Sequence, residues 1–271
     1  MTRRRVVELH YRYTPTWGYT RLVGPGQADL QYLEVGLLRL QAGQVYEETT
    51  AGQEVALTLL SGACDIRAGS QHWPDLHRRD PFRDWERPTT AYVPIQTPLR
   101  VEARSELEIA VSKALTDFQG QPGLIRPEEV RNRVVGRGQP WQWEIHFCLP
   151  RDYPSGRLFV GEDLSLPGNW CSYPPHKHDQ DRPPDEANME EVFFYKLDPR
   201  QGFGLQRVYT ADGSFDRAYV VKENDCVALP WGHHPAVAAG GYRLFFVWSM
   251  ARSAQPGGVV TDPEHAWLRT D

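Results

Sequence analysis

Short apolar stretches recur along the chain, and turns rich in glycine, proline, asparagine and aspartate separate them. Aromatic and β-branched residues are frequent in these stretches, and they favour strands. Residues 127–133 (PEEVRNR) alone predict a short helix. With 23 glycines and 22 prolines as well, the pattern predicts an all-β chain of sandwiches or barrels. The strands are predicted at residues 32–40, 54–60, 90–95, 107–114, 141–149, 157–164, 191–197, 204–210, 217–221, 226–230 and 242–250.

The strand pattern also repeats once at long range. Glu54 opens one apolar stretch and Pro94 ends another, and Glu191 and Pro230 occupy the matching places in the second half. The two pairs are offset by 137 and 136 residues. A repeat of this kind predicts two tandem copies of one barrel. The predicted division is a barrel in residues 1–120, a linker in residues 121–135 and a second barrel in residues 136–271.

The composition limits the classes of protein to consider. The net charge of −5 is mild, so neither nucleic acid nor an anionic membrane is predicted as a partner. No apolar run approaches the roughly 18 residues that a membrane-spanning helix needs, and no secretory signal is visible. The cysteines form no CxxC pair, which argues against a disulfide framework and predicts a cytoplasmic protein. They are Cys64, Cys148, Cys171 and Cys226.

Three histidines and a glutamate in the second half form the strongest chemical signal. His176 and His178, in PPHKHD, are two positions apart, so on a strand both side chains point to one face. Glu191 opens the apolar stretch that follows, and His234 comes after a Pro-x-Gly turn. Three imidazoles and one carboxylate meeting inside a β-barrel suit a divalent metal ion. The sequence therefore predicts a metal site on these four side chains.

The first half lacks this set of ligands. No HxH pair precedes Glu54, and Pro98 stands where His234 stands in the second half. The first barrel is therefore predicted to hold no metal and to have a structural role, and the chemistry is predicted in the second barrel.

These motifs resemble those of a known family. The order HxH, glutamate, PxGxH resembles the cupin superfamily, whose barrels hold a metal on three histidines and one glutamate. Longer segments resemble the 5-deoxy-glucuronate isomerases of bacterial inositol catabolism, which are bicupins related to the 5-keto-4-deoxyuronate isomerases of pectin breakdown. The resemblance is dense over residues 155–267 and looser over residues 1–130. It is carried by GEDLSLPGNWCSYPPHKHD, EEVFFYKLDPRQGFGLQRVYTADGSFD, NDCVALPWGHHPAVAAGGYRLFFVWSMA and DPEHAW.

The resemblance implies conversion of 5-deoxy-D-glucuronate to 5-dehydro-2-deoxy-D-gluconate. An aldose–ketose isomerisation moves a proton between adjacent carbons through an enediol-type intermediate. It requires a Lewis acid for the developing oxyanion and a base for the carbon-bound proton. No redox step is involved, so zinc or manganese would serve, and the ligand types also suit nickel or iron.

Neighbouring side chains are candidates for binding the substrate and moving its proton. Arg207 is the first candidate for the substrate carboxylate, because a guanidinium binds a carboxylate through two hydrogen bonds. Gln206 alternates with Arg207, so only one of them faces the barrel interior. Tyr209 shares the parity of Arg207 and is a candidate catalytic residue, while Tyr173 is a candidate wall of the sugar pocket. Other candidate bases are Glu190, Asp179 and His233.

Two further classes of function use the same features. A cupin dioxygenase would hold iron on the same four ligands, and a sugar-binding or regulatory cupin would need no catalytic base. The chain has no helix-turn-helix signal and no basic stripe, and a complete ligand set favours chemistry over binding alone. Exposed sheet edges in such barrels favour a homo-oligomer.

Overall fold

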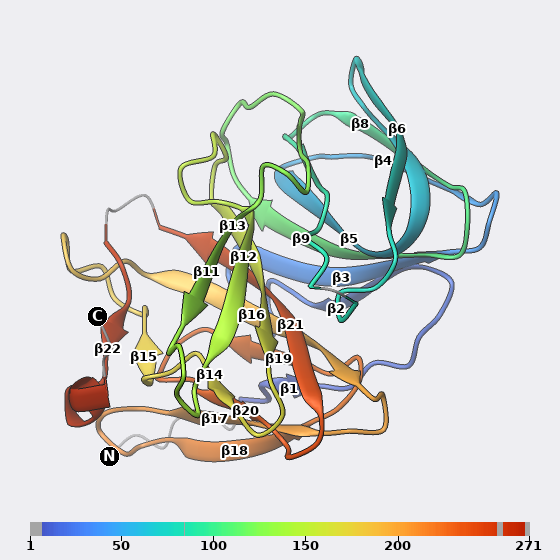
Figure 1. Cartoon of the computed structure of the whole chain (residues 1–271). Helices are drawn as coiled ribbons and strands as arrows, with labels where there is room; N and C mark the ends of the chain where they lie inside the picture. The colour runs from blue at the N-terminus through green and yellow to red at the C-terminus, as the bar shows by residue number, and fades with distance from the viewer. Residues whose placement is uncertain (1–6, 84, 254–256, 269–271) are drawn as a thin grey trace.

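The computed structural model describes residues 7–83, 85–253 and 257–268, and it confirms the all-β prediction (Figure 1). Every stretch predicted as a strand contains one. The first half contains β2 (Gly18–Val23), β3 (Leu33–Leu40), β4 (Val45–Thr49), β5 (Gln53–Ala68), β6 (Gln71–Arg78), β7 (Thr90–Val93), β8 (Pro98–Ala103), β9 (Leu107–Leu115) and β10 (Gly123–Ile125). The second half contains β11 (Arg131–Val135), β12 (Trp143–Leu149), β13 (Leu158–Ser165), β14 (Trp170–Cys171), β15 (His176–Lys177), β16 (Met189–Asp198), β17 (Gly204–Tyr209), β18 (Asp216–Val221), β19 (Cys226–Leu229), β20 (Ala236–Ala238), β21 (Arg243–Arg252), β22 (Val260–Thr261) and the 3-10 helix η1 (Pro263–Leu268). β1 (His10–Tyr11) precedes both halves.

The first half, at the upper right of Figure 1, folds around the long strand β5. Its sheet runs β10-β7-β5-β9-β3-β2, and the last part of β5 leaves this layer to pair with β6 and β8. Gly62 lies at the corner with a φ of 95°, and a Cβ there would lie 2.1 Å from the Glu106 carbonyl oxygen. The corner therefore requires glycine, and it closes the layers around an aliphatic core.

The second half encloses a more polar interior. A seven-stranded sheet runs β1-β19-β16-β21-β13-β12-β11, and a four-stranded sheet runs β14-β20-β17-β18. On β16, Phe193 stacks on Phe246 of β21 with ring centroids 4.3 Å apart, and Tyr195 donates a hydrogen bond to Gln206 of β17. Because side chains alternate along a strand, Glu191 lies on this same inward face of β16.

A reciprocal pair of buried glutamates joins the two halves. Glu54 on β5 accepts the backbone N–H groups of residues 156–158, at 2.5 to 2.8 Å. Glu190 on β16 accepts those of residues 31–33, at 2.7 to 2.9 Å. Glu54 thus fixes the chain that leads into β13, and Glu190 fixes the chain that leads into β3. Hydrogen bonds to an ionised carboxylate are stronger than those between neutral groups, so these contacts set the relative position of the halves.

The prediction of a helix at residues 127–133 is wrong. A single turn forms instead, because the Glu129 N–H donates to the Arg126 carbonyl at 2.9 Å and the Glu129 carboxylate accepts the Arg126 N–H. The chain then enters β11, whose five residues pair with β12, and this ladder outweighs the local helix preference. The predicted linker, residues 121–135, contains β10, which pairs with β7 of the first half, and β11, which pairs with β12 of the second. The division into residues 1–120, 121–135 and 136–271 stays a prediction. No helix in the described ranges is long and apolar enough to cross a membrane.

Candidate metal centre

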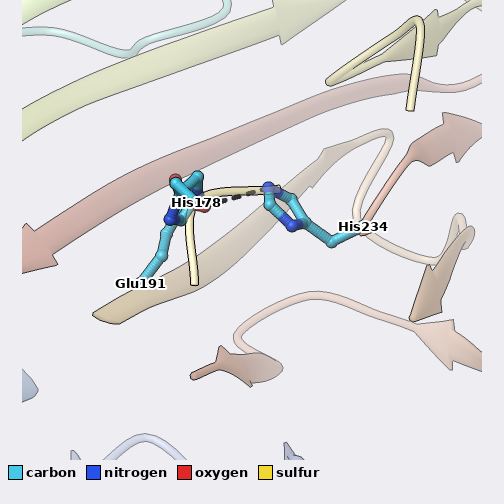
Figure 2. Close-up of side chains that lie close together, drawn as sticks. All are labelled: His178, Glu191 and His234. Atoms are coloured by element: carbon cyan, nitrogen blue, oxygen red, sulfur yellow. Dashed lines mark hydrogen bonds and ion pairs between the residues drawn. The ribbon is translucent and has the colours of Figure 1, made fainter. Parts of the chain in front are cut away.

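Three of the four predicted ligands meet inside the second barrel (Figure 2). His178 follows β15, Glu191 lies on β16, and His234 lies between β19 and β20. One nitrogen or oxygen atom of each lies within 4.8 Å of the others, and all three side chains are buried. The Glu191 Oε2 atom lies 3.0 Å from His178 Nε2 and 3.2 Å from His234 Nε2. Among the described residues this is the one such group of histidine, cysteine and acidic side chains.

Backbone carbonyls fix the orientation of both imidazoles. His178 Nδ1 lies 2.8 Å from the Met189 carbonyl oxygen, and His234 Nδ1 lies 2.9 Å from the Gly232 carbonyl oxygen. Each Nδ1 must therefore carry the proton that it donates, which turns the Nε2 lone pair toward Glu191. His234 Nε2 is buried and has no hydrogen-bond partner. In the neutral imidazoles that bind metals, both Nε2 lone pairs would face one carboxylate, and a cation between them would bind all three groups, so the donor set fits a metal ion.

The pKa shifts have the same origin. Burial raises the pKa of Glu191, but its close contacts with His178 and His234 outweigh burial and hold this pKa at about 2. Burial lowers the pKa of His178, but the hydrogen bond with Glu191 outweighs it and raises this pKa. The carboxylate is therefore ionised and draws positive charge toward the Nε2 atoms.

His176 lies beside this group of three. Its ring centroid is 4.9 Å from that of His234 and 6.3 Å from that of His178. Its Nδ1 atom is 3.3 Å from the Pro174 carbonyl oxygen. Burial, reinforced by the other two histidines, lowers the His176 pKa to about 3, which favours the neutral form that binds metals. Its role as a ligand stays a prediction.

Lys177 links the two segments that carry the histidines. It points away from the three ligands, as the alternation along β15 predicts, and pairs with Asp179 and with Glu186, the latter at 2.6 Å. Asp179 also accepts the Gly232 N–H at 2.9 Å, in the turn before His234. Asp179 is therefore committed to structure, since both of its oxygens have partners.

Gln206, rather than Arg207, faces the interior of the barrel. The Gln206 Nε2 atom donates to the His234 carbonyl at 2.7 Å, so this side chain holds the backbone of a ligand. Arg207, on the opposite face of β17, forms a two-point ion pair with Asp216 at 2.9 and 2.7 Å. The Arg207 side chain is 42% exposed, and the structure gives its guanidinium a partner already.

The aromatic candidates lie in two different clusters. Tyr209 donates to Asp262 at 2.6 Å, and its ring stacks on His233 with centroids 4.9 Å apart. The buried Nδ1 atom of His233 has no hydrogen-bond partner, which leaves it free to bind a proton or a polar group. The ring of Tyr173 lies between those of Trp141 and Trp170, at 5.8 and 5.5 Å. Glu190, another candidate base, binds the backbone of the first half instead.

Asp163 is an interior carboxyl group that the sequence analysis missed. On β13 it is directly opposite Phe246 of β21, and Phe246 is directly opposite Tyr195 of β16. Directly paired residues share a face of the sheet, so Asp163 faces inward like Tyr195 and Glu191. It is buried and accepts a hydrogen bond from Trp248 Nε1 at 2.8 Å. Burial raises its pKa well above the usual value. The alternation of faces along the predicted strand 157–164 could have indicated it, because Asp163 is a polar residue at an inward position.

Comparisons with known proteins agree with this architecture. The model of the KduI/IolB family matches residues 14–268. A 5-deoxy-glucuronate isomerase of Geobacillus kaustophilus is 36% identical over 246 residues, which cover 91% of this chain and 89% of the relative. The crystal structure of an IolB-like protein from Salmonella typhimurium has a TM-score of 0.93 and 29% identity, and the match covers 97% of this chain and 100% of that one.

More distant structures share the fold alone. An oxalate decarboxylase of Lactobacillus farciminis, solved as a formate complex, has a TM-score of 0.69 at 10% identity over 98% of this chain and 92% of that one. The cupin fold predicted from the motifs is thereby confirmed. Since the family model spans nearly the whole chain and a relative above 30% identity covers most of it, the chain belongs to the KduI/IolB family.

Proposed function

We propose that this protein is a metal-dependent aldose–ketose isomerase that converts 5-deoxy-D-glucuronate to 5-dehydro-2-deoxy-D-gluconate. One observation carries the proposal: a buried group of His178, Glu191 and His234, with a lone pair left unpartnered, in a chain of the KduI/IolB family. The curated relative from Geobacillus kaustophilus is named for this activity.

The ion is proposed to bind His178, Glu191 and His234, with His176 as the fourth ligand. When bound, a divalent ion supplies a Lewis acid for the oxygens of the substrate. The isomerisation needs no change of oxidation state, so zinc or manganese is proposed. Gln206 holds the backbone of His234 in place. Lys177 pairs with Asp179, and Asp179 accepts the Gly232 N–H, which ties the segment of His178 to the turn before His234.

The proton transfer is proposed to use the cluster of Tyr209, His233 and Asp262. The Tyr209 hydroxyl donates to Asp262, and burial raises the Tyr209 pKa, so this hydroxyl stays protonated and acts as a hydrogen-bond donor. The unpartnered Nδ1 of His233, in the position next to His234, can accept a proton. Tyr173 is proposed to wall the sugar pocket, and Arg207 is proposed to support the Tyr209 ring, which its guanidinium covers at 4.1 Å.

A cytoplasmic homo-oligomer is proposed as the working form. The four cysteines are buried free thiols, which suits a reducing compartment. β18 is an edge strand, and the apolar side chains of Leu205 and Val220 are opposite each other and exposed on β17 and β18. A second copy covering such an edge would remove it from water.

One preparation tests the proposed function. Metal content per chain is measured, and 5-deoxy-D-glucuronate turnover is followed by NMR under nitrogen. About one ion per chain, with ketose formed without oxygen, is the expected result. Turnover that requires oxygen would identify a dioxygenase, and one bound ion with no turnover in either gas would remove this substrate from the proposal.

A further inference from the structure

A cleft rich in arginine opens on the second half of the chain. It has a volume of about 1300 Å³, which is ample for a six-carbon sugar acid and ordered water. Phe147 and Phe159 are the aromatic residues of its lining, which also includes Gly257 and Gly258. Four of the residues that line it are arginines, and one is acidic. These are Arg131, Arg133, Arg151, Arg252 and Asp152.

The charges in this cleft are not balanced. Asp152 forms an ion pair with Arg131, and both side chains are exposed. Arg252 donates to two backbone carbonyls, those of Arg151 at 2.7 Å and Ser155 at 3.4 Å, and to no carboxylate. Within the described ranges Arg133 and Arg151 form no ion pair either. The cleft therefore has an excess of positive charge, and guanidinium groups suit a carboxylate ligand.

Arg252 connects the cleft to the metal centre. It ends β21, two residues after Met250, so both side chains lie on one face of the strand. Met250 is the register partner of Glu191, which makes Arg252 the diagonal neighbour of this metal ligand across the β16–β21 pair. Diagonal neighbours of this kind are about 7–8 Å apart. Phe159 is the other register partner of Met250, so the cleft wall continues the same surface.

A second part of the lining leads toward the predicted ligand His176. Gly258 is followed within two residues by β22, in which Thr261 pairs with His176. At roughly 3.3 Å per residue, Thr261 lies at most about 10 Å along the chain from Gly258, and His176 lies directly across the ladder from Thr261. Two segments that line the cleft therefore lead to strands that pair with strands carrying predicted metal ligands.

We infer that this cleft binds the carboxylate of the substrate, with Arg252 as its main partner and Arg133 as a second. The inference rests on the proposed function and names the part of the site that recognises a sugar acid. The carboxylate carbon of a six-carbon acid lies about 6 Å from its aldehyde carbon, since each bond of 1.5 Å advances roughly 1.3 Å. That span is of the same order as the separation of diagonal neighbours such as Glu191 and Arg252. Arg207 is not needed for this role, because Asp216 already holds it.

Steady-state kinetics on the full chain with its metal tests the inference. The variants are Arg252→Gln, Arg252→Lys and Arg133→Gln, and the control is Arg67→Gln, an exposed arginine of β5 in the first half. Loss of the charged hydrogen bonds in Arg252→Gln should raise KM for 5-deoxy-D-glucuronate roughly 10- to 100-fold, with a smaller change in kcat. Arg252→Lys should recover part of the loss, and Arg67→Gln should match the wild type.

The primary amide of the substrate separates recognition of charge from damage to the fold. Wild type should favour the acid over the amide, and Arg252→Gln should remove this preference without weakening the amide further. Arg133→Gln lies on the exposed edge strand β11, so it provides a second test of the cleft if the Arg252 variants do not fold. An unchanged ratio of acid to amide in both Gln variants, with wild-type turnover intact, would overturn the inference and leave the proposed function standing.

A binding measurement keeps the inference testable if wild type turns over no 5-deoxy-D-glucuronate. Calorimetric titration with D-glucuronate and with D-glucose then compares an acid with a neutral sugar. Tighter binding of the acid by wild type, lost in Arg252→Gln and Arg133→Gln, supports the cleft. Equal binding of both sugars by wild type overturns it.

Discussion

The two halves share one framework and differ in what fills it. β5, β7 and β9 reappear 136 residues later at the starts of β16, β19 and β21 to within a residue. Inside the first barrel, Val55 and Leu57 point into an aliphatic core. The residues 136 positions later are Glu191 and Phe193, on the inward face of the metal barrel. The same strands can therefore support either a closed apolar core or a buried polar site.

Glu54, Glu190 and Glu191 show how a contact between the halves is separated from the polar site inside the second half. Glu54 and Glu190 are equivalent, because each accepts three backbone N–H groups from the other half. The sequence analysis paired Glu54 with Glu191, which is wrong by one residue. On a strand one residue changes the face, so Glu190 points out to the other half and Glu191, the predicted ligand, points inward. The second half carries both, and the first half carries only the structural one.

The largest expected effect breaks the ligand set itself. His178→Ala removes one of the nitrogens within 4.8 Å of the Glu191 carboxylate, and bound metal should fall at least about 100-fold in affinity, with activity lost to the same degree. The measurement is metal content after dialysis, followed by turnover. His77→Ala, an exposed histidine of the first half, is the control and should keep its full metal. Equal metal loss in both variants would contradict a single site in the second barrel.

A buried ion pair between the halves is expected to have the next largest effect. Arg78, 2% exposed, binds Glu162 of β13 through two hydrogen bonds of 2.9 and 2.7 Å. Arg78→Met leaves the Glu162 carboxylate buried beside His146 alone, and should lower the free energy of unfolding by about 3–5 kcal/mol. The double variant with Glu162→Gln should recover part of this loss, since it removes the unpaired charge. Urea unfolding measures both.

The pH dependence of that ion pair has a defined sign. Burial raises the pKa of Glu162, but Arg78 and His146 outweigh it and lower this pKa. A carboxyl group with a depressed folded-state pKa stabilises the fold fully above its unfolded pKa of about 4.3 and loses that contribution as pH falls through the folded value. Wild type should therefore lose more stability than Arg78→Met when urea unfolding is repeated at pH 3. A steeper loss in the variant would contradict this assignment.

The sequence predicts much of this molecule, and the exceptions have physical causes. Alternation and β-branched residues located the long central strands, but β11 depends on its ladder with β12, which no local pattern shows. Spacing within one half was enough to single out His178, Glu191 and His234, which the structure brings together. Arg252 could not be found this way, because its place next to Glu191 follows from the register of β16 with β21. Arg78 and Glu162 meet from 84 residues apart for the same reason.

The matched glutamates allow a sharper test of the comparison. Glu54→Gln and Glu190→Gln each weaken charged hydrogen bonds to three backbone N–H groups, and each should cost about 1.5–3 kcal/mol of stability. Neither should change metal content per folded chain, because neither side chain points to the ligands. Glu191→Gln is the matched contrast, one position from Glu190, and should lose metal with a smaller loss of stability. Thermal unfolding and metal analysis of the three variants separate these roles, and metal loss in Glu190→Gln would contradict the assignment of faces.

The smallest expected effect concerns the arginine that the sequence favoured. Arg207 and Asp216 form their ion pair at 42% and 52% exposure, and exposed pairs contribute at most about 1 kcal/mol because water screens them. Arg207→Gln should therefore change stability by less than that and KM for the sugar acid by less than about 3-fold. Arg252 differs from Arg207 because its guanidinium donates only to backbone carbonyls, and because Arg252 is the diagonal neighbour of Glu191. A KM effect of Arg207→Gln as large as that of Arg252→Gln would mean that the carboxylate reaches β17, and that the acid is held from the side of the Tyr209 ring.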